Sequence, residues 1–283
     1  MGLHIRDGAT ADGRYRLVVT PRSAAWTYSG LRVLELPPGG RHGLDTGGDE
    51  LLVLPLSGGC AVCCDGRSFT LTGRVDVFAG PTDFAYLPPG SVATIESPGG
   101  GRFALPSALC GPAGLAGRRR FEARYGPAAS VPVELRGAGR ASRQVHNFCA
   151  AGSFDADRLI AVEVLTPGGN WSSYPPHKHD EEREDERRLE EIYYFELRGG
   201  PGAVGYQSTV DVLAEVRHGD TVLVPHGYHG PSMAAPGYDM YYLNVMAGPV
   251  REWRFRDDPA HAWIRGTWAS ETVDPRLPFG RAQ

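Results

Sequence analysis

Short apolar runs separated by glycine and proline recur along this chain and determine its predicted architecture. Their lengths suit strands, and the three-to-four-residue apolar spacing of an amphipathic helix is scarce. The dipeptide Asp65-Gly66 between two runs is typical of a two-residue hairpin turn. With 38 glycines and 23 prolines spread without a fixed period, the pattern indicates a turn-rich, all-β protein. We predict strands over residues 31–36, 50–56, 60–64, 67–71, 75–78, 84–87, 159–165, 191–197, 202–206, 210–216, 219–225 and 238–246.

The strand pattern is interrupted once, and a domain boundary is predicted there. Residues 99–139 are rich in glycine, alanine, proline and arginine. Their basic cluster at 118–120 is expected to be a solvated connector. We therefore expect one domain over residues 1–125 and a second over residues 126–283.

The two predicted domains echo each other in sequence. Residues 49–54 have a counterpart in residues 190–195, and residues 87–90 have one in residues 224–227. Matches of this kind indicate two copies of one β domain in a single chain.

Composition and charge narrow the class of protein. The chain has 283 residues, 41% of them apolar, and a net charge of -4, which gives no electrostatic case for binding nucleic acid. No apolar run is long enough for a membrane span, and the N-terminus lacks the core of a signal peptide. Five cysteines, an odd number, point to reduced thiols that behave as small buried hydrophobes. We expect a cytoplasmic protein without nucleic-acid or membrane partners, and homo-oligomer formation is left open.

A metal site is the chemistry that the sequence indicates most directly. In an extended segment His177 and His179 share a face while Lys178 points away, and the prolines at 175 and 176 disfavour a helix. Two imidazoles with a nearby carboxylate, such as Glu191, form a site for a divalent metal ion. His229 is our candidate for the fourth ligand. The alternative is an exposed polar strand whose histidines bind water.

These motifs resemble those of the cupin superfamily, whose small β-barrels bind a metal through His-x-His, a later Glu, and a His after Pro-x-Gly. The spacing departs from that pattern, since eleven residues separate His179 from Glu191 and one residue is missing between Gly227 and His229. Glu190 and His226 therefore remain alternatives as ligands. The resemblance implies a bicupin, with two small double-stranded β-helix barrels.

A longer stretch resembles the 5-deoxy-glucuronate isomerase family of myo-inositol catabolism. The resemblance is carried by residues 170–180, 190–194, 224–229 and 236–248, which include the run Trp-Ser-Ser-Tyr-Pro-Pro-His-Lys-His. It implies an isomerase that converts 5-deoxy-D-glucuronate to 2-deoxy-5-keto-D-gluconate. By position, the implied ligands of one divalent ion (zinc, manganese or iron) are His177, His179, Glu191 and His229.

Such a reaction needs an acid–base group and a cation for the substrate carboxylate. Glu163, Lys178 and Tyr242 are candidates for the catalytic group, since the sequence does not single out one. Arg143, Lys178 and Arg183 are candidates for carboxylate binding, and Asn244 shares a strand face with Tyr242 and is a further substrate-binding candidate.

Two rival functions and two structural questions stay open. A cupin dioxygenase would use the same ligands for iron, and a sugar-binding cupin would use them without turnover. The acidic run at residues 180–190 is expected to be a solvated loop, with a lid over the site as the alternative. The first domain is expected to bind no metal, because Val92 and the adjacent Ala93 fall where the second domain has His229.

Overall fold

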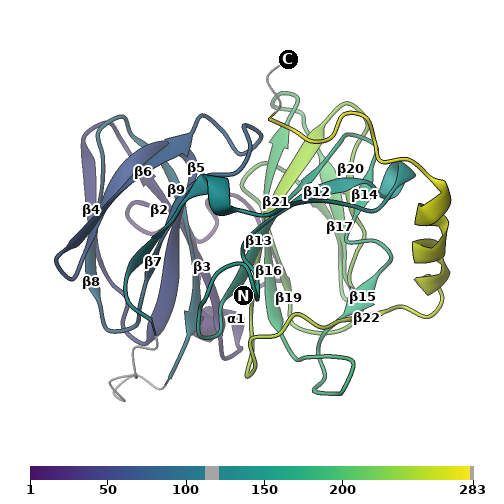
Figure 1. Cartoon of the computed structure of the whole chain (residues 1–283), viewed down its shortest axis with the longest axis horizontal. Coiled ribbons are helices and arrows are strands. Elements are labelled where there is room, and N and C mark those ends of the chain that lie inside the picture. Colours follow the sequence, from purple (N-terminus) through teal and green to yellow (C-terminus); the bar gives the residue numbers. More distant parts are fainter. Residues whose placement is uncertain (112–120, 281–283) are drawn as a thin grey trace.

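The computed structural model describes residues 1–111 and 121–280, so the basic cluster at 118–120 lies outside the described residues. It consists of two bodies of curled β-sheet lying side by side (Figure 1). In the described ranges helical structure is limited to α1 (Pro21–Ala24) and the 3-10 segments η1 (Ala128–Ser130), η2 (Gly139–Ala141) and η3 (Ala262–Ser270). No helix in these ranges is long and apolar enough to cross a membrane.

The first body is a barrel in which the strand order β10-β7-β5-β9-β3-β2 forms one side. β4, β6 and β8 complete it through pairs with one another and with β5. Its strands are β2 (Tyr15–Val19), β3 (Ser29–Leu36), β4 (Gly40–Asp45), β5 (Asp49–Cys64), β6 (Arg67–Arg74), β7 (Phe84–Leu87), β8 (Val92–Ser97), β9 (Gly101–Leu109) and β10 (Arg124–Gly126).

The second body contains a larger sheet and two smaller ones. The orders are β1-β19-β16-β21-β13-β12-β11, β14-β20-β17-β18 and β15-β22. Its strands are β1 (His4–Ile5), β11 (Val133–Arg136), β12 (Arg143–Cys149), β13 (Ile160–Thr166), β14 (Trp171–Ser172), β15 (His177–Lys178), β16 (Glu190–Arg198), β17 (Gly205–Ser208), β18 (Leu213–Val216), β19 (Thr221–Val224), β20 (Ser232–Ala234), β21 (Asp239–Ala247) and β22 (Arg256–Asp257).

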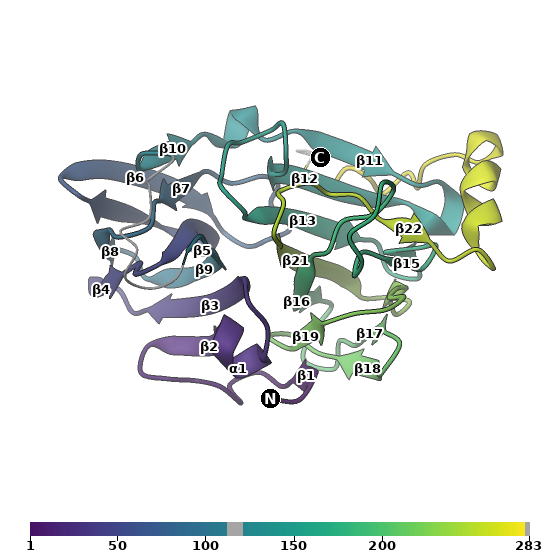
Figure 2. The same ribbon diagram turned by 90° about the horizontal axis from the view of Figure 1, so that it is seen from below.

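The N-terminal strand β1 belongs to the second body although it precedes the first. It pairs with β19, and the two strands lie side by side in Figure 2. The Asp220 carboxylate holds the following residues, accepting hydrogen bonds from the Arg6 side chain at 2.8 Å and the Asp7 amide at 3.0 Å. The predicted first domain, residues 1–125, therefore includes an N-terminal strand that belongs to the sheet of the second body.

Most of the predicted strands are present, but those predicted over 202–206 and 210–216 begin three residues later, at Gly205 and Leu213, and two further regions differ. Residues 75–78 form a turn, because the Asp76 carboxylate accepts a hydrogen bond from the Phe78 amide at 2.8 Å and bends the backbone. The runs at 50–56 and 60–64 are joined in the single strand β5, which has register shifts opposite both β9 and β6. The hairpin at Asp65-Gly66 is confirmed, with φ of 49° and 81°. Among the cysteines, Cys63 is exposed rather than buried.

A shared apolar core joins the two bodies. Leu52 and Leu54 of β5 and Ile192 and Tyr194 of β16 belong to this one cluster. The alternate residues of the same strands point into separate clusters inside each barrel, such as Val53 in the first and Tyr193 in the second. Strand alternation thus divides each sheet into an interface face and an interior face.

Two glutamates clamp the bodies together reciprocally. Glu50, at the start of β5, accepts hydrogen bonds from the backbone amides of residues 157–159 at 2.7–2.8 Å. Glu190, at the start of β16, accepts hydrogen bonds from the amides of residues 27–29 at 2.7–2.9 Å. Each carboxylate therefore binds the segment that leads into a strand of the other body. Hydrogen bonds to an ionised group are among the stronger ones in proteins.

The predicted match of residues 49–54 with residues 190–195 is wrong by one residue, as the strand registers show. Leu51 pairs with Leu87 in the first barrel, and Glu191 pairs with Val224 in the second. Leu51, rather than Glu50, therefore occupies the place of Glu191, and Glu50 corresponds to Glu190. The leucine side chain offers no ligand atom at that position.

Candidate metal centre and active site

The backbone itself brings two of the predicted ligands together. His177 lies in the short strand β15, and its amide donates to the carbonyl of His229 at 3.0 Å while the His229 amide donates back at 2.9 Å. On its other side β15 pairs with β22. This pairing holds the His-x-His segment extended, as the sequence predicts, and it fixes the loop after β19 beside it.

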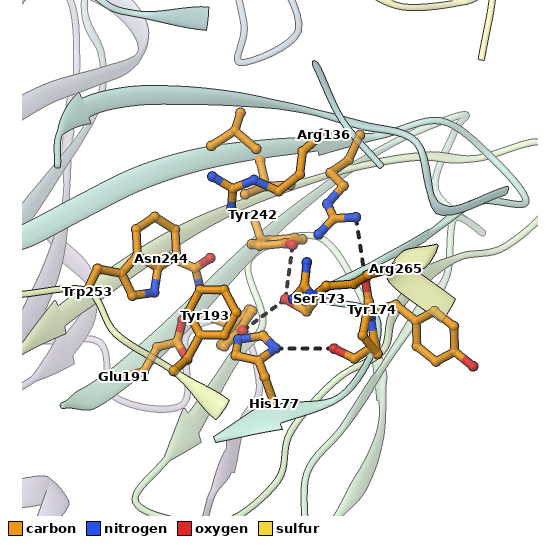
Figure 3. A pocket seen from close by; sticks show the side chains of 15 residues that line it. Arg136, Ser173, Tyr174, His177, Glu191, Tyr193, Tyr242, Asn244, Trp253 and Arg265 are labelled. Carbon is orange, nitrogen blue, oxygen red and sulfur yellow. Dashed lines mark hydrogen bonds between the residues drawn. The ribbon is translucent and has the colours of Figure 1, made fainter. Parts of the chain in front are cut away.

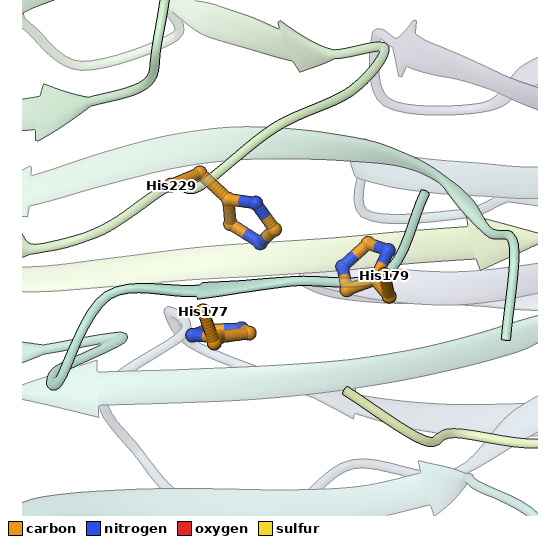
Figure 4. Close-up of side chains that lie close together, drawn as sticks. All are labelled: His177, His179 and His229. Atoms are coloured by element: carbon orange, nitrogen blue, oxygen red, sulfur yellow. The ribbon is translucent and has the colours of Figure 1, made fainter. Parts of the chain in front are cut away.

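Glu191 and the three histidines converge in the barrel interior (Figure 4 shows the imidazoles). Glu191 Oε2 lies 3.1 Å from His179 Nε2 and 3.0 Å from His229 Nε2. The three histidines each offer a ligand atom within 4.8 Å of the others. All four side chains are buried, with at most 9% exposed.

The second nitrogen of each imidazole is held by backbone. Nδ1 of His179 lies 3.1 Å from the Leu189 carbonyl oxygen, and Nδ1 of His229 lies 3.1 Å from that of Gly227. Nδ1 of His177 lies 3.4 Å from the Pro175 carbonyl oxygen. Carbonyl acceptors favour a proton on Nδ1, which leaves each Nε2 as a lone-pair donor facing the centre.

The electrostatics of the group suit a bound cation. Burial alone would raise the pKa of Glu191, but the contacts with His179 and His229 hold it well below its usual range. Burial, together with the neighbouring His229 and His179, lowers the pKa of His177. Burial also lowers the pKa of His179, but the contact with Glu191 outweighs this effect and raises that pKa above its usual value.

A further observation points to an ion rather than to a closed hydrogen-bond network. His229 Nε2 is buried and makes no hydrogen bond of acceptable geometry to any described residue, although Glu191 is close. Three imidazole nitrogens and one carboxylate oxygen are a common donor set for zinc, manganese or iron. The buried triad can therefore bind a metal, and the Glu191 carboxylate lies beside two of its imidazoles.

The two alternative ligands occupy other places. Glu190 is engaged in the clamp to the first body. His226 is exposed, 3.5 Å from Asp211 on the surface. Of the four predicted alternatives, Glu191 and His229 lie in the buried histidine centre, and Glu190 and His226 lie outside it.

A cavity of about 340 Å³ opens onto this centre (Figure 3). His177 and Glu191 form part of its wall, and Arg136 lies across the cavity from them. The lining residues are Arg136, Arg143, Val145, Val164, Ser173, Tyr174, Pro175, His177, Glu191, Tyr193, Tyr242, Asn244, Trp253, Phe255 and Arg265. The wall combines aromatic surfaces with guanidinium, amide and hydroxyl groups.

Three of the other predicted site residues line this cavity and three do not. Tyr242, Asn244 and Arg143 project into it from β21 and β12. Glu163 lies on the opposite face of β13, where it pairs with Arg74 of the first body, whereas Lys178 is bound to Asp180 at 2.7 Å. Arg183 is exposed and pairs with Glu181.

Sequence reasoning missed several lining residues. Tyr193 could have been found, because it shares a strand face with Glu191, and Ser173 lies within the motif that precedes His177. Trp253, Phe255 and Arg265 belong to the C-terminal tail, where no periodic pattern indicated that the segment folds back onto the barrel.

The acidic segment before β16 is anchored at its base. Glu186 is fully buried, and its Oε1 accepts from the amides of Asp180 and Glu181 at 2.8 and 3.0 Å. Asp180 in turn accepts from the Gly227 amide at 2.6 Å. Lys178 completes this network, which ties the segment to the loop that carries His229.

The fold and site define the class of protein: a bicupin of two β-barrels with a histidine-rich centre in the second. The oxalate decarboxylase of Lactobacillus farciminis shares this fold, with a TM-score of 0.60 at 14% identity over 91% of this chain and 88% of that one. An IolB-like protein from Salmonella typhimurium LT2 is more similar, with a TM-score of 0.84 at 34% identity over 93% of this chain and 99% of that one.

The family follows from sequence comparison. The model of the KduI/IolB family matches residues 3–264, and the chain belongs to this family. The 5-deoxy-glucuronate isomerase of Geobacillus kaustophilus is 41% identical over 255 residues, covering 87% of this chain and 89% of the relative. That of Bacillus subtilis strain 168 is 36% identical over 257 residues, covering 87% and 91%.

Proposed function

We propose that this chain is the aldose–ketose isomerase that converts 5-deoxy-D-glucuronate to 2-deoxy-5-keto-D-gluconate in inositol catabolism. One divalent ion, zinc, manganese or iron, is held by His177, His179, Glu191 and His229. The observation that carries the proposal is that His177 and Glu191 form part of the wall of a cavity that three arginines also line, with Arg136 across from them (Figure 3). The names of the relatives, which are 5-deoxy-glucuronate isomerases, support the same reaction.

Isomerisation moves a proton between neighbouring carbons while negative charge develops on two adjacent oxygens. A bound divalent ion would supply Lewis-acid stabilisation of that charge. The protein contributes a fixed geometry, because the backbone carbonyls hold three imidazoles in place before substrate arrives.

A chain of hydroxyl groups in the cavity suits proton movement. Ser173 Oγ lies 3.0 Å from the Tyr193 hydroxyl and 3.3 Å from the Tyr242 hydroxyl. Burial raises the pKa of both tyrosines, so their hydroxyls stay protonated at neutral pH and can donate to a substrate oxygen. Tyr242 is the predicted acid–base residue that this geometry supports, acting at its hydroxyl oxygen.

Two donors in the site fit a small acidic sugar. The Asn244 amide nitrogen and the Trp253 indole nitrogen are buried and have no hydrogen-bond partner among the described residues. Both residues line the cavity, where sugar hydroxyl or carbonyl oxygens would satisfy them.

The test is direct assay of the purified protein. Incubation with 5-deoxy-D-glucuronate should give the ketose by NMR, and a chelator should abolish turnover until zinc, manganese or iron is restored. Turnover with zinc under anaerobic conditions would separate the isomerase from an iron dioxygenase. If no ketose forms with zinc, with manganese or with iron, the proposed reaction is refuted.

A further inference from the structure

Arg143 is a feature of the cavity that the metal centre does not explain. Its side chain is buried, with the residue 5% exposed, and it donates to the carbonyl oxygens of Ala141 and Tyr174 at 3.0 and 3.5 Å. None of the described residues places a carboxylate within ion-pair distance of it. Burial lowers its pKa to about 10, so the group is still a cation at neutral pH.

The neighbouring arginines already have their own partners. Arg136 binds Glu134 through two nitrogens at 2.9 and 2.7 Å. Arg265 makes a two-pronged pair with Asp257, including a contact of 2.7 Å. Of these three guanidinium groups along the cavity wall, two are neutralised, and the positive charge of Arg143 remains.

Aromatic rings hold the guanidinium groups in place. The ring of Trp268, in η3, lies 5.3 Å from the Arg143 guanidinium carbon and 5.2 Å from that of Arg265. The ring of Trp253 lies 5.4 Å from that of Arg136. Stacking of this kind fixes the planar donors without consuming the hydrogen bonds that they can give to a ligand.

A buried cation without a counter-charge is costly, and it is retained where something else supplies the negative charge. We infer that Arg143 binds the carboxylate of the substrate, with Arg136 and Arg265 flanking it, and that it makes the site selective for an acidic sugar over its neutral analogue. This inference rests on the proposed function and assigns the recognition step within it.

The arrangement also orients the substrate. The reacting carbonyl and the carboxylate stand at opposite ends of a six-carbon chain. The metal ligands His177 and Glu191 likewise lie across the cavity from Arg136 (Figure 3). An acid bound by Arg143 with its carboxylate towards Arg136 therefore has its aldehyde directed towards His177 and Glu191.

The experiment compares the acid with 5-deoxy-D-glucose, in which an alcohol replaces the carboxylate. In wild-type protein kcat/KM should favour the acid strongly. Arg143→Gln should reduce kcat/KM for the acid on the order of a hundredfold and leave that for the neutral sugar within about threefold. Arg143→Lys keeps the positive charge but loses the planar pair of donors that can bind both carboxylate oxygens. It should recover part of the preference for the acid. Arg217→Gln removes an exposed arginine paired with Glu215 and should change neither value.

Calorimetric binding separates this inference from the proposed reaction. The probe is the reduced substrate, whose aldehyde is an alcohol, and its control is 5-deoxy-D-glucitol. Tighter binding of the acid that depends on Arg143 supports the inference even if no isomerisation is seen. Isomerisation with an undiminished preference for the acid in Arg143→Gln overturns the inference and leaves the proposed reaction intact.

A folding control keeps the result interpretable. Arg143→Gln removes an uncompensated charge, so its melting temperature should match or exceed that of the wild type. If that variant does not fold, Arg143→Lys carries the test, because lysine keeps the positive charge but loses the planar two-pronged donor group. A preference for the acid that is undiminished in Arg143→Lys would then count against the assignment of Arg143.

Discussion

At the scale of single residues, the two ring nitrogens of each histidine in the centre have different surroundings. One ring nitrogen binds a backbone carbonyl, and the other faces the centre beside Glu191. Orientation is thus set by the main chain and does not depend on an ion being bound. Losing one imidazole should therefore remove a ligand without removing the fold.

We predict that His179→Ala and His229→Ala each lower metal content below one equivalent per chain and reduce turnover on the order of a hundredfold or more. Circular dichroism should show that both proteins stay folded. His226→Ala is the matched control, because this exposed histidine lies in the same loop but outside the centre. Full activity and full metal content in His229→Ala would contradict the assignment.

The convergence of the three histidines could be predicted because they lie in short motifs, where strand alternation alone aligns His177 with His179. Arg265 and Trp253 could not, because their approach to the cavity depends on the tail folding over β12 and β15. Glu163, a candidate catalytic residue, lies outside the cavity, because the sequence does not tell which face of a fully buried strand meets the other body.

At the scale of elements, the backbone pairing of His177 with His229 depends on the glycine that follows. Gly230 has a φ of +93°, and a Cβ there would lie 1.9 Å from the Ser173 carbonyl oxygen. The loop after β19 can therefore pass this close to the segment before β15 only without a side chain.

We predict that Gly230→Ala displaces His229, lowers metal affinity and destabilises the fold by more than the ~1–2 kcal/mol expected for a left-handed alanine. Gly237→Ala is the control, with a φ of +90° and no atom within 4 Å of an added Cβ. Chemical denaturation and metal titration of both variants check this. Equal effects of the two substitutions would show that the close approach is unimportant.

Strand positions were largely predictable, because continuous apolar runs such as those of β16 and β21 match strands buried on both faces. The turn at residues 75–78 was not, since an Asx-type hydrogen bond from the Phe78 amide to the Asp76 carboxylate overrides a local preference for strand. The one-residue error between the halves has a similar origin. Acidic pairs at 49–50 and 190–191 look alike in sequence, and only strand register separates them.

At the scale of the whole molecule, a buried ionic network spans the two bodies. Glu163 of β13 accepts a hydrogen bond from the Tyr241 hydroxyl at 2.8 Å and lies 2.9 Å from His146 Nδ1. Arg74 of β6 reaches it from the first body, with one nitrogen at 3.3 Å. Burial acts to raise the pKa of Glu163, but Arg74 and His146 outweigh it and lower the pKa to about 2.

We predict that Glu163→Gln loses about 3–5 kcal/mol of unfolding free energy at neutral pH, because Arg74 is left buried and unpaired. Because the pKa of Glu163 is lower in the folded state, its carboxylate stabilises the fold at any pH above the ordinary pKa of a glutamate. This stabilisation is lost as the pH falls from that value towards 2. The difference between variant and wild type should thus be constant above about pH 5 and shrink below about pH 4.

Urea denaturation from pH 7 down to pH 3 measures this difference. Glu215→Gln, which removes an exposed partner of Arg217, should change the free energy of unfolding by less than about 0.5 kcal/mol. If the difference in unfolding free energy between Glu163→Gln and wild type instead grew as the pH fell, the loss of stability could not come from the ionised Glu163 network.

The reciprocal hydrogen bonds of Glu50 and Glu190 also limit which substitutions such a chain can accept as its sequence evolves. The proposed active site lies in one barrel, but a carboxylate of each barrel binds backbone amides of the other, so each barrel stabilises the other. The interior of the first barrel, with Leu51 in the place of Glu191, is free to exchange apolar side chains of similar volume. In a library of single substitutions, positions 50 and 190 should be about equally intolerant, while positions 51 and 191 should differ sharply in what they accept.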